Sequence, residues 1–254
     1  MRVSVILPAR NETGVIRKMV TMMLALYSKY ILEIIVVDDG STDDTAKIVK
    51  SIAKHDHRVK LISRASPHGV GLAIRTGLKH VSKQATHIFS LDSDFIRNLP
   101  DLEDFFIRIK DYDGLIGSRY LRQHSLIRYP ATKKFFNRCF HLLVRLLYGV
   151  SNADLTNNFK LYKKSVFDRL SLSADGYAVN AETGLYPILL GFHIGEIPVT
   201  WYARDDDMGF SKFNLLKVAS GYIGILVNAS RYSNRFMAKY FFKYLRTSVE
   251  FPKR

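Results

Sequence analysis

Cysteine is almost absent from this chain of 254 residues, in which Cys139 is the only one. A single cysteine cannot form a disulfide within the chain, and its isolation fits a reducing compartment. No base stands beside Cys139 in the sequence to activate its thiol. We therefore expect Cys139 to be a small apolar residue on a helix and not a catalytic nucleophile.

Long apolar runs are also missing. A membrane-spanning helix needs about 18 uninterrupted apolar residues, and the nearest approach, at 213–227, is interrupted by Lys217. The N-terminus leads into a short apolar run that is broken by Pro8, too short for the core of a signal peptide. We therefore expect a cytoplasmic protein without a transmembrane helix.

Acidic residues are few compared with basic ones. The chain has 38 Lys and Arg against 23 Asp and Glu, which gives a net charge of +15. This balance indicates an anionic partner such as a nucleic acid, a phosphorylated substrate or an acidic membrane surface. Hydrophobic residues make up 47% of the chain, so it can form a sizeable core. Its length fits one large domain, alone or with an appendix.

The first part of the chain alternates between short apolar runs and amphipathic stretches. The pattern predicts an α/β fold built from βαβ units, with a mostly parallel sheet and helices on both faces. Pro8 is expected to end the first strand, and Ser41 or Thr42 to cap the second helix. Strands are predicted at 3–7, 34–37, 59–62, 86–91 and 115–117, and helices at 13–29, 43–54, from 69 onward and at 100–110.

Polar clusters follow three of these strands, at 8–12, 38–41 and 92–94. Ligands of parallel α/β sheets bind beyond the carboxyl ends of the strands, so we expect the three clusters to converge. Asp92 and Asp94 are two carboxylates just past a buried strand. Mg²⁺ is commonly held by one or two carboxylates together with substrate phosphates, which makes this pair a candidate metal site.

The pattern changes after Arg119. A helix is predicted at 131–148, with several basic residues and no acids. It either packs on the core with a solvated basic edge or lies in a membrane interface, and the sequence leaves both interpretations open. A strand at 159–162, a helix at 178–190, an extended segment at 193–202, a polar loop at 204–212 and a helical tail at 213–246 follow. The apolar stripe of the 131–148 helix is expected to contain Phe135, Phe136, Phe140, Leu142, Leu143, Leu146 and Leu147.

Five segments, in this order and spacing, resemble glycosyltransferase family 2: 8–12, 37–43, 68–73, 91–94 and 117–120. Later segments, at 154–162, 195–199 and 204–212, resemble its dolichol-phosphate mannose synthase, or polyprenyl-phosphate glycosyltransferase, branch. The resemblance covers about residues 2–215. It implies the GT-A fold, with a catalytic domain at 1–212 that includes the helix at about 131–148. An amphipathic helical tail at 213–254 would follow.

This resemblance implies inverting transfer of a single hexose from a nucleotide sugar to a polyprenyl or dolichyl phosphate, with Mg²⁺ or Mn²⁺ as cofactor. Mannose is the expected sugar and GDP-mannose the expected donor, with UDP-glucose as the alternative. The enzyme would associate peripherally with the cytoplasmic face of a membrane, on its own or through an anchoring partner protein. No nucleic acid partner is expected.

Residue roles carry over by position. Asp92 and Asp94 would bind the metal and, with Arg119, take part in catalysis. Lys134 and Arg119 would contact the acceptor phosphate. The resemblance implies that the nucleotide sugar is bound by Pro8, Arg10, Glu12, Val37, Asp39, Asp92, Ser93, Arg204 and Lys212.

The sequence departs from the family at three places. Ile96 stands where the family often has Gln or another polar metal ligand, so water, substrate or another residue must complete the metal shell. Arg10 replaces the usual Tyr beside the base. The loop at 204–212 contains three consecutive acids, Asp205 to Asp207, and is longer than usual.

Two other functions remain open. A transferase acting on a saccharide or protein would need a carboxylate base, for which Glu182 is the candidate; otherwise Glu182 is a helix-surface or salt-bridged carboxylate. A phosphate acceptor, already anionic, needs little help from a base. A non-catalytic basic protein on nucleic acid or membrane is the third hypothesis, although no aromatic-rich nucleic-acid motif supports it. Gly69-x-Gly71 lacks the third glycine of a dinucleotide fingerprint.

Overall fold

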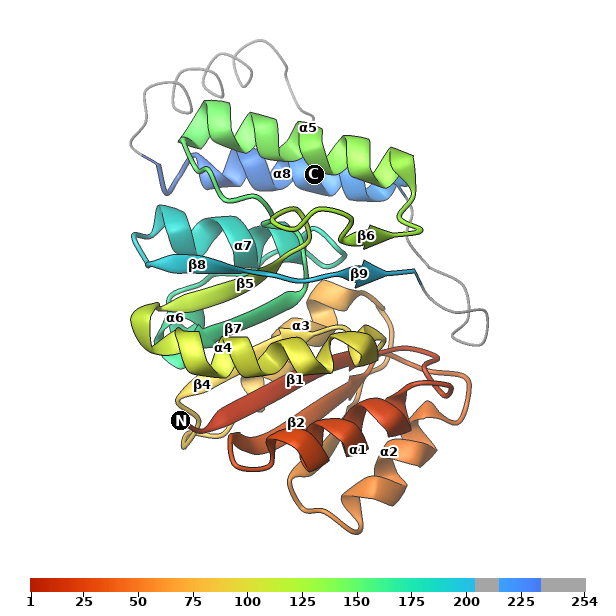
Figure 1. The fold of residues 1–254 in the computed structure, drawn as a ribbon. Helices are drawn as coiled ribbons and strands as arrows, with labels where there is room; N and C mark the ends of the chain where they lie inside the picture. The colour runs from red at the N-terminus through yellow and green to blue at the C-terminus, as the bar shows by residue number, and fades with distance from the viewer. Residues whose placement is uncertain (204–214, 234–254) are drawn as a thin grey trace.

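A seven-stranded sheet forms the centre of the protein in a computed structural model that describes residues 1–203 and 215–233 (Figure 1). All strands run parallel except β7, which lies antiparallel between β4 and β5. The predicted mostly parallel α/β sheet is therefore confirmed. The strand order is β3 (Val59–Ser63), β2 (Ile31–Asp38), β1 (Val3–Ala9), β4 (His87–Leu91), β7 (Phe159–Lys163), β5 (Gly114–Ser118) and β8 (Ile194–Pro198).

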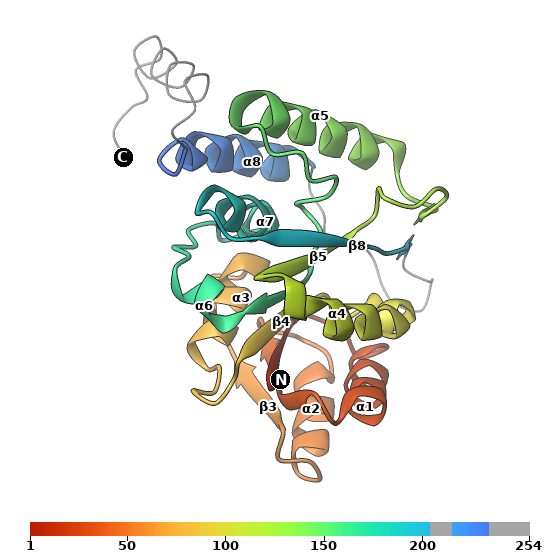
Figure 2. The same cartoon turned by 60° about the vertical axis from the view of Figure 1, so that its left-hand side comes forward.

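Helices cover both faces of this sheet. One face is covered by α1 (Ile16–Tyr27), α2 (Thr45–Ala53) and α4 (Leu102–Arg108), and the other by α3 (Val70–Lys79) and α7 (Val179–Leu189). Beyond α7, α5 (Ala131–Tyr148) and α8 (Leu215–Ala229) lie side by side (Figures 1 and 2). The remaining elements are η1 (Phe95–Asp101), η2 (Ile109–Asp111), α6 (Lys164–Asp168) and the ribbon of β6 (Leu126–Ile127) and β9 (Trp201–Tyr202).

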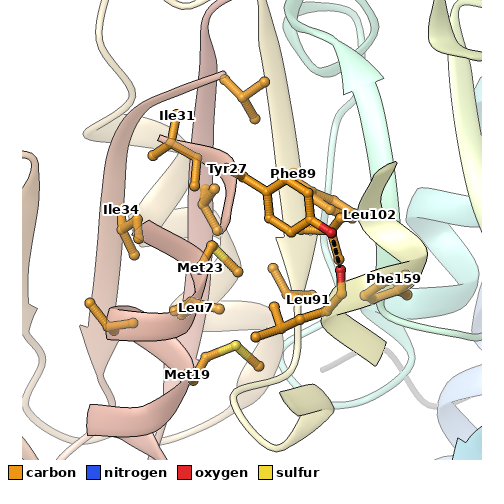
Figure 3. Packing of buried hydrophobic residues seen from close by; sticks show 14 of the residues in the cluster. Leu7, Met19, Met23, Tyr27, Ile31, Ile34, Phe89, Leu91, Leu102 and Phe159 are labelled. Carbon is orange, nitrogen blue, oxygen red and sulfur yellow. Dashed lines mark hydrogen bonds between the residues drawn. The ribbon is translucent and has the colours of Figure 1, made fainter. Parts of the chain in front are cut away.

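An apolar core under β1, β2 and β4 holds the strand that leads to Asp92. Phe89 of β4 packs on Phe159 of β7, with ring centroids 5.2 Å apart, and Phe105 of α4 lies 5.1 Å from Phe159. The Tyr27 hydroxyl of α1 donates a 2.7 Å hydrogen bond to the Leu99 carbonyl (Figure 3). Burial of large apolar side chains, worth about 1.5–3 kcal/mol each, fixes β4 against α1 and α4.

Pro8 does not end the first strand, because β1 continues to Ala9. The reason lies in the pairing of β1 with its two neighbours. β4 pairs with Val3 to Ile6 only, whereas β2 accompanies β1 through Pro8 and Ala9. Proline lacks the backbone N–H that a ladder on both sides would use, and at this one-sided position it is tolerated.

The start of α2 also differs from the prediction, since neither Ser41 nor Thr42 caps it. The helix begins at Thr45, and Asp43 accepts a 3.0 Å hydrogen bond from the Thr45 amide. Ser41 and Thr42 instead bond to the loop after β1. The competition between capping and loop pairing was not visible in the local sequence.

The apolar residues of α5 divide between two faces. Phe140, Val144 and Leu147 are buried in the core that α5 shares with α7 and α8. The other predicted stripe residues face outward and are 43% to 63% exposed: Phe135, Phe136, Leu142, Leu143 and Leu146. The core contact agrees with the first of the two interpretations, and the membrane interface stays a prediction.

The first part of the predicted tail belongs to the packed structure. α8 contacts α7 and α5, and Ile225, Leu226 and Ala229 are buried there. The predicted boundary at 212/213 lies outside the described residues, so the division into two domains stays a prediction. No helix among the described residues has the length and apolar character to span a membrane.

Candidate active site

The loops that follow β1 and β2 are joined by hydrogen bonds at the carboxyl edge of the sheet. The Asn11 amide donates to Ser41 Oγ at 2.9 Å, and Asn11 Oδ1 accepts from the Thr42 amide at 2.8 Å. The Glu12 amide donates to Thr45 Oγ1 at 2.8 Å. Two of the three predicted polar clusters, 8–12 and 38–41, are thus joined by hydrogen bonds into one surface, which we call the loop wall.

The loop after β3 extends the loop wall, because it bonds to Asp39. The Arg64 guanidinium donates to Asp39 Oδ1, and the Gly69 amide donates to Asp39 Oδ2 at 2.6 Å. The His68 ring lies 3.8 Å from Asp39 Oδ1 and directly against Gly40, whose φ of +71° favours glycine. Asp39 is therefore a fixed carboxylate, oriented by two donors.

Other residues predicted for the nucleotide sugar differ in exposure. Arg10 is exposed and Pro8 half-buried at the end of β1, while Glu12 is buried in the loop that follows. The Val37 side chain is fully buried and packs with Ala73 of α3 below the sheet. Strand alternation directs it to the face covered by α3, where it is enclosed, so the structure does not support a Val37 side-chain contact with the nucleotide.

Asp92, Ser93 and Asp94 follow directly after β4. Ser93 is buried, and both carboxylate residues are half-buried. Asn158 Nδ2 donates a 2.7 Å hydrogen bond to Asp92 Oδ1, and Ser90 Oγ donates to Asn158 Oδ1 at 2.8 Å. The structure thus places the predicted metal carboxylates at the edge where the nucleotide candidates lie, since β4 neighbours β1.

Ile96 contributes nothing to this carboxylate pair. It is 7% exposed and belongs to the core below η1. No group of three His, Cys, Asp or Glu that could hold a metal occurs among the described residues. Asp92 and Asp94 offer the hard oxygen ligands that suit Mg²⁺ or Mn²⁺, but only with further ligands from substrate or water.

Arg119, predicted to neutralise phosphate, is buried in an ion pair with Asp154. Its Nε donates to Asp154 Oδ2 at 2.6 Å and its Nη2 to Asp154 Oδ1 at 2.9 Å. Burial alone would raise the pKa of Asp154, but the charge and hydrogen bonds of Arg119 lower this pKa to about 2. The pair is thus ionised and neutral as a unit. A phosphate contact of Arg119 stays a prediction, and a phosphate would compete with Asp154.

The Arg119–Asp154 pair continues into a polar network that reaches α5. Arg119 Nη2 donates to Thr156 Oγ1 at 2.8 Å, and Thr156 Oγ1 donates to Asn137 Oδ1 at 3.0 Å. On the next turn of α5, His141 Nε2 accepts from the Leu155 amide at 2.8 Å. Burial lowers the pKa of His141, which agrees with a neutral ring that accepts at Nε2. These bonds fix α5 to the loop before β7.

Lys160 is a fully buried lysine of β7. Its Nζ donates to Thr183 Oγ1 of α7 at 2.8 Å and to the Asn180 carbonyl at 2.5 Å. Burial lowers the pKa of Lys160 to about 7, although the charge of Asp154 acts in the opposite direction. Lys160 therefore connects β7 with α7.

Glu182, the candidate base, is buried and not on a helix surface. It accepts hydrogen bonds from the Ser173 amide at 2.9 Å, the Ser173 hydroxyl at 2.6 Å and the Ala174 amide at 3.0 Å. Neither of its predicted environments, a helix surface or a salt bridge, is what these contacts show. The contacts give Glu182 the role of holding the loop before α7.

That loop closes the N-terminus of α3. The Asp175 carbonyl accepts from the amides of Gly71 and Leu72, at 2.8 and 3.2 Å. A Cβ on Gly71 would lie 2.0 Å from the Ala174 carbonyl oxygen, which explains the glycine. The first amides of α3 are therefore occupied by protein, in agreement with the rejected dinucleotide fingerprint.

One of the remaining predicted cations is exposed on α5, and the other two lie outside the described residues. Lys134 is exposed in the first turn of α5. Arg204 and Lys212 lie outside the described residues, as does the acidic loop that contains them.

Sequence reasoning missed several residues at the site. Arg64 and His68 follow β3, and the strand-end rule applied to this third strand would have found them. Asn158 and Lys160 stood within a family segment without a role, and their parity on β7 could have placed them opposite Ser90. No sequence signal identified Asp154 as the partner of Arg119.

Solved structures share this architecture. Mannosyl-3-phosphoglycerate synthase from Rubrobacter xylanophilus superposes with a TM-score of 0.68 at 14% identity, covering 100% of this chain and 77% of that one. Glucosyl-3-phosphoglycerate synthase from Mycobacterium tuberculosis, in complex with Mn²⁺, UDP and phosphoglyceric acid, gives a TM-score of 0.66 at 20% identity, covering 90% and 78%. At these identities the likeness shows the fold alone, which is the GT-A fold.

Sequence relatives are closer. A polyprenol monophosphomannose synthase of Mycolicibacterium smegmatis is 28% identical over 189 residues, which cover 72% of this chain and 71% of the relative. An undecaprenyl-phosphate mannosyltransferase of Micrococcus luteus is 25% identical over 239 residues, covering 91% and 94%. The family model for glycosyl transferase family 2 matches residues 4–171, more than half of the chain. The protein therefore belongs to glycosyl transferase family 2 and is a glycosyltransferase.

Proposed function

We propose that this enzyme transfers one mannose, with inversion, from a nucleotide sugar to the phosphate of a polyprenyl phosphate. The observation that carries the proposal is the alignment of nearly the whole chain with an undecaprenyl-phosphate mannosyltransferase. The position of Asp92 and Asp94, beside the joined loops after β1 and β2, supports it.

The donor would bind at the loop wall around Asp39. A fixed carboxylate accepts hydrogen bonds from the ring N–H of guanine or of uracil. Arg10, exposed at the end of β1, would reach the base or the ribose. GDP-mannose is the donor that we propose, because the relatives transfer mannose by name, and UDP-glucose is the alternative to test.

Asp92 and Asp94 would hold Mg²⁺ or Mn²⁺ together with the diphosphate of the donor. When bound, the cation would neutralise the charge that develops on the leaving nucleoside diphosphate. The carboxylate pair supplies two of the ligands, and the buried Ile96 supplies none.

The acceptor phosphate would attack the anomeric carbon of mannose from the face opposite the diphosphate. A new bond forms between a phosphate oxygen and this carbon as the bond from the carbon to the diphosphate breaks, and the diphosphate leaves with the electron pair. A phosphate monoester is anionic at neutral pH and needs little help from a base. Glu182, the base candidate for a neutral acceptor, holds the loop at Ser173, and this favours the phosphate acceptor.

The outward face of α5 would lie on the membrane that contains the acceptor. Its exposed apolar side chains, Phe135, Leu142 and Leu146 among them, stand beside Lys134, Arg138 and Arg145, and α5 contains no acid. An interfacial helix combines such an apolar face with cations that meet anionic lipid. Ile223 on the neighbouring α8 is also exposed and would extend this surface.

The test is a transfer assay with a panel of radiolabelled nucleotide sugars. GDP-mannose, UDP-glucose and GDP-glucose are each incubated with the protein, Mg²⁺ or Mn²⁺, and one of three acceptors: undecaprenyl phosphate, 3-phosphoglycerate or mannose. We expect label from GDP-mannose to enter the organic phase with undecaprenyl phosphate only, and the transfer to stop in chelator.

Other outcomes would reject the proposal. Transfer of label to 3-phosphoglycerate, with the product separated from unreacted donor, would indicate the acceptor class of the structural neighbours. Transfer to free mannose would indicate a saccharide acceptor. If no label were transferred from any of the three donors to any of the three acceptors, the proposed reaction would be rejected.

A further inference from the structure

Asn158 lies just before β7, opposite the end of β4. Leu91 pairs with Phe159 in the antiparallel ladder, so Asn158 comes next to Asp92. The Asn158 side chain is 2% exposed, and Ser90, on the same face of β4, is 4% exposed. The two antiparallel backbones therefore hold a buried amide beside the first metal carboxylate.

Both ends of the Asn158 amide are engaged. Its Nδ2 donates to Asp92 Oδ1 at 2.7 Å, and its Oδ1 accepts from the Ser90 hydroxyl at 2.8 Å. Turning the amide by 180° would place its oxygen against a carboxylate oxygen, which is unfavourable. Asp92 and Ser90 together thus fix the orientation of the amide, and the amide fixes the orientation of Asp92.

This contact matters because the side chain of Ile96 cannot serve as an additional metal ligand. Ile96 is buried in the core, so its side chain contributes an apolar anchor and no donor atom. With two protein carboxylates as its ligands, the cation would depend on how exactly Asp92 and Asp94 are held. Hydrogen-bonded partners of ligating carboxylates commonly have this role.

We propose that Asn158 is a positioning residue that holds Asp92 for the cation and the donor diphosphate, with Ser90 orienting Asn158. The inference rests on the proposed function, since it assumes that Asp92 binds a cation with a nucleotide. It assigns a role to the start of β7, which sequence reasoning left without one. Loss of an outer partner of this kind typically weakens metal affinity about 10–100-fold.

The experiment compares two neighbouring buried asparagines. Asn157 is 3% exposed and donates to the Gly117 carbonyl at 2.7 Å, so Asn157→Ala removes a buried amide of the same kind that does not touch Asp92. Mn²⁺ binding in the presence of GDP, or of UDP, is measured by the electron spin resonance signal of free Mn²⁺. Thermal unfolding of each variant is measured in parallel.

We expect Asn158→Ala to weaken Mn²⁺ binding about 10–100-fold, and Asn157→Ala to change it less than threefold at a comparable loss of thermal stability. Ser90→Ala is expected to fall between the two. In turnover, Asn158→Ala should lower kcat and raise the Mn²⁺ concentration needed, with little change in the KM for the lipid phosphate.

Three results would overturn the inference. Equal Mn²⁺ affinities for the Asn158→Ala and wild-type proteins would show that Asp92 needs no such support. Equal losses in Asn157→Ala and Asn158→Ala would show a general structural effect. Wild-type Mn²⁺ affinity in Asn158→Leu would show that the volume of the side chain matters and not its hydrogen bond to Asp92. If the wild-type protein failed to bind Mn²⁺ both in the presence of GDP and in the presence of UDP, the proposed function would be rejected, and the inference with it.

Discussion

The N-terminal half of the molecule, from β1 to η2, and the C-terminal half, from β5 to α8, are built in different ways. In the N-terminal half, loops of successive βα units bond to each other, as Asn11 does with Ser41 and Thr42. In the C-terminal half, the key contacts join residues that local patterns do not relate, such as Arg119 with Asp154 and Lys160 with Thr183. The first half repeats one local plan, and the second half depends on partners that meet only after folding.

The two halves also handle charge differently. The N-terminal half presents carboxylates at its loop edge, Asp39, Asp92 and Asp94 among them. The C-terminal half keeps two of its basic side chains, Arg119 and Lys160, inside the protein, and it exposes others on α5. We infer that the buried basic side chains support the fold and that the exposed ones would meet the anionic acceptor and its membrane.

Asp154→Asn should have the largest effect, because it leaves the Arg119 guanidinium buried without its counter-charge. Breaking a buried ion pair on one side costs about 3–5 kcal/mol. The free energy of unfolding, measured in urea, should fall by this amount. Asp168→Asn, which breaks the exposed pair with Lys164, is the control and should cost less than about 1 kcal/mol. Equal effects of the two variants would contradict the structural role of Arg119.

Asp94→Asn, in the N-terminal half, should lower activity and leave the free energy of unfolding nearly unchanged. Asp154→Asn, in the C-terminal half, acts mainly on the free energy of unfolding. Loss of one group that offsets charge on a leaving diphosphate reduces kcat by about 10²–10³-fold. Transfer of mannose to undecaprenyl phosphate is the measurement. Asp104→Asn, at an exposed site on α4, serves as the control. Full activity of Asp94→Asn would remove Asp94 from the site.

The double variant Leu142→Asp/Leu146→Asp should weaken binding to vesicles that contain anionic lipid. Each leucine would lose an apolar contact worth about 1.5–3 kcal/mol, and the added charges would repel the lipid, so a loss of at least tenfold is expected. Leu26→Asp is the matched control, since Leu26 of α1 is 52% exposed, close to the 57% of Leu142 and 56% of Leu146. Co-sedimentation distinguishes the three proteins. A comparable loss in Leu26→Asp would argue against a specific face.

The smallest expected effect is the loss of folding stability as the pH is lowered. The pKa of Asp154 is lowered to about 2 by Arg119, and that of Asp43 to about 2 by hydrogen bonds from Thr13 and Thr45, in both cases against the effect of burial. A carboxyl with a lowered pKa stabilises the fold above its unfolded pKa of about 4, and this contribution is lost as the pH falls towards 2. For buried Asp154 the loss is about 2 kcal/mol, whereas exposed Asp43 should contribute less.

Acid unfolding curves of Asp154→Asn and Asp43→Asn test this difference. Relative to the wild-type protein, the Asp154→Asn curve should be flatter between pH 4 and pH 2. The Asp43→Asn curve should stay close to the wild type. The opposite ranking would mean that the loops of the N-terminal half carry more of the acid sensitivity.

The same contrast between halves explains what the sequence could predict. Strand ends and turn residues are local signals, so the positions of Asp39, Asp92 and Asp94 at one edge followed from the pattern of strands. The continuation of β1 through Pro8 did not, because it depends on which neighbour strand extends that far. A local pattern does not state how the ladders on each side of a strand end.

In the C-terminal half the amphipathic pattern of α5 predicted a helix and left its environment open. The stripe contained both Phe140, which is buried, and Leu142, which is exposed, because the helix has apolar residues on more than one side. Arg119 was identified by its motif, but its burial depends on Asp154, 35 residues away. Composition and spacing cannot show such a partner.

The loop that closes α3 has a consequence for the order in which the chain can mature. The segment that matches the family model ends at residue 171, before Asp175, whose carbonyl completes the first turn of α3. A polypeptide shortened to that segment would also lack α7 and the edge strand β8. During synthesis, the N-terminal half can reach its final form only when the chain has passed Asp175. A fragment limited to residues 4–171 should therefore fail to fold into a stable catalytic domain.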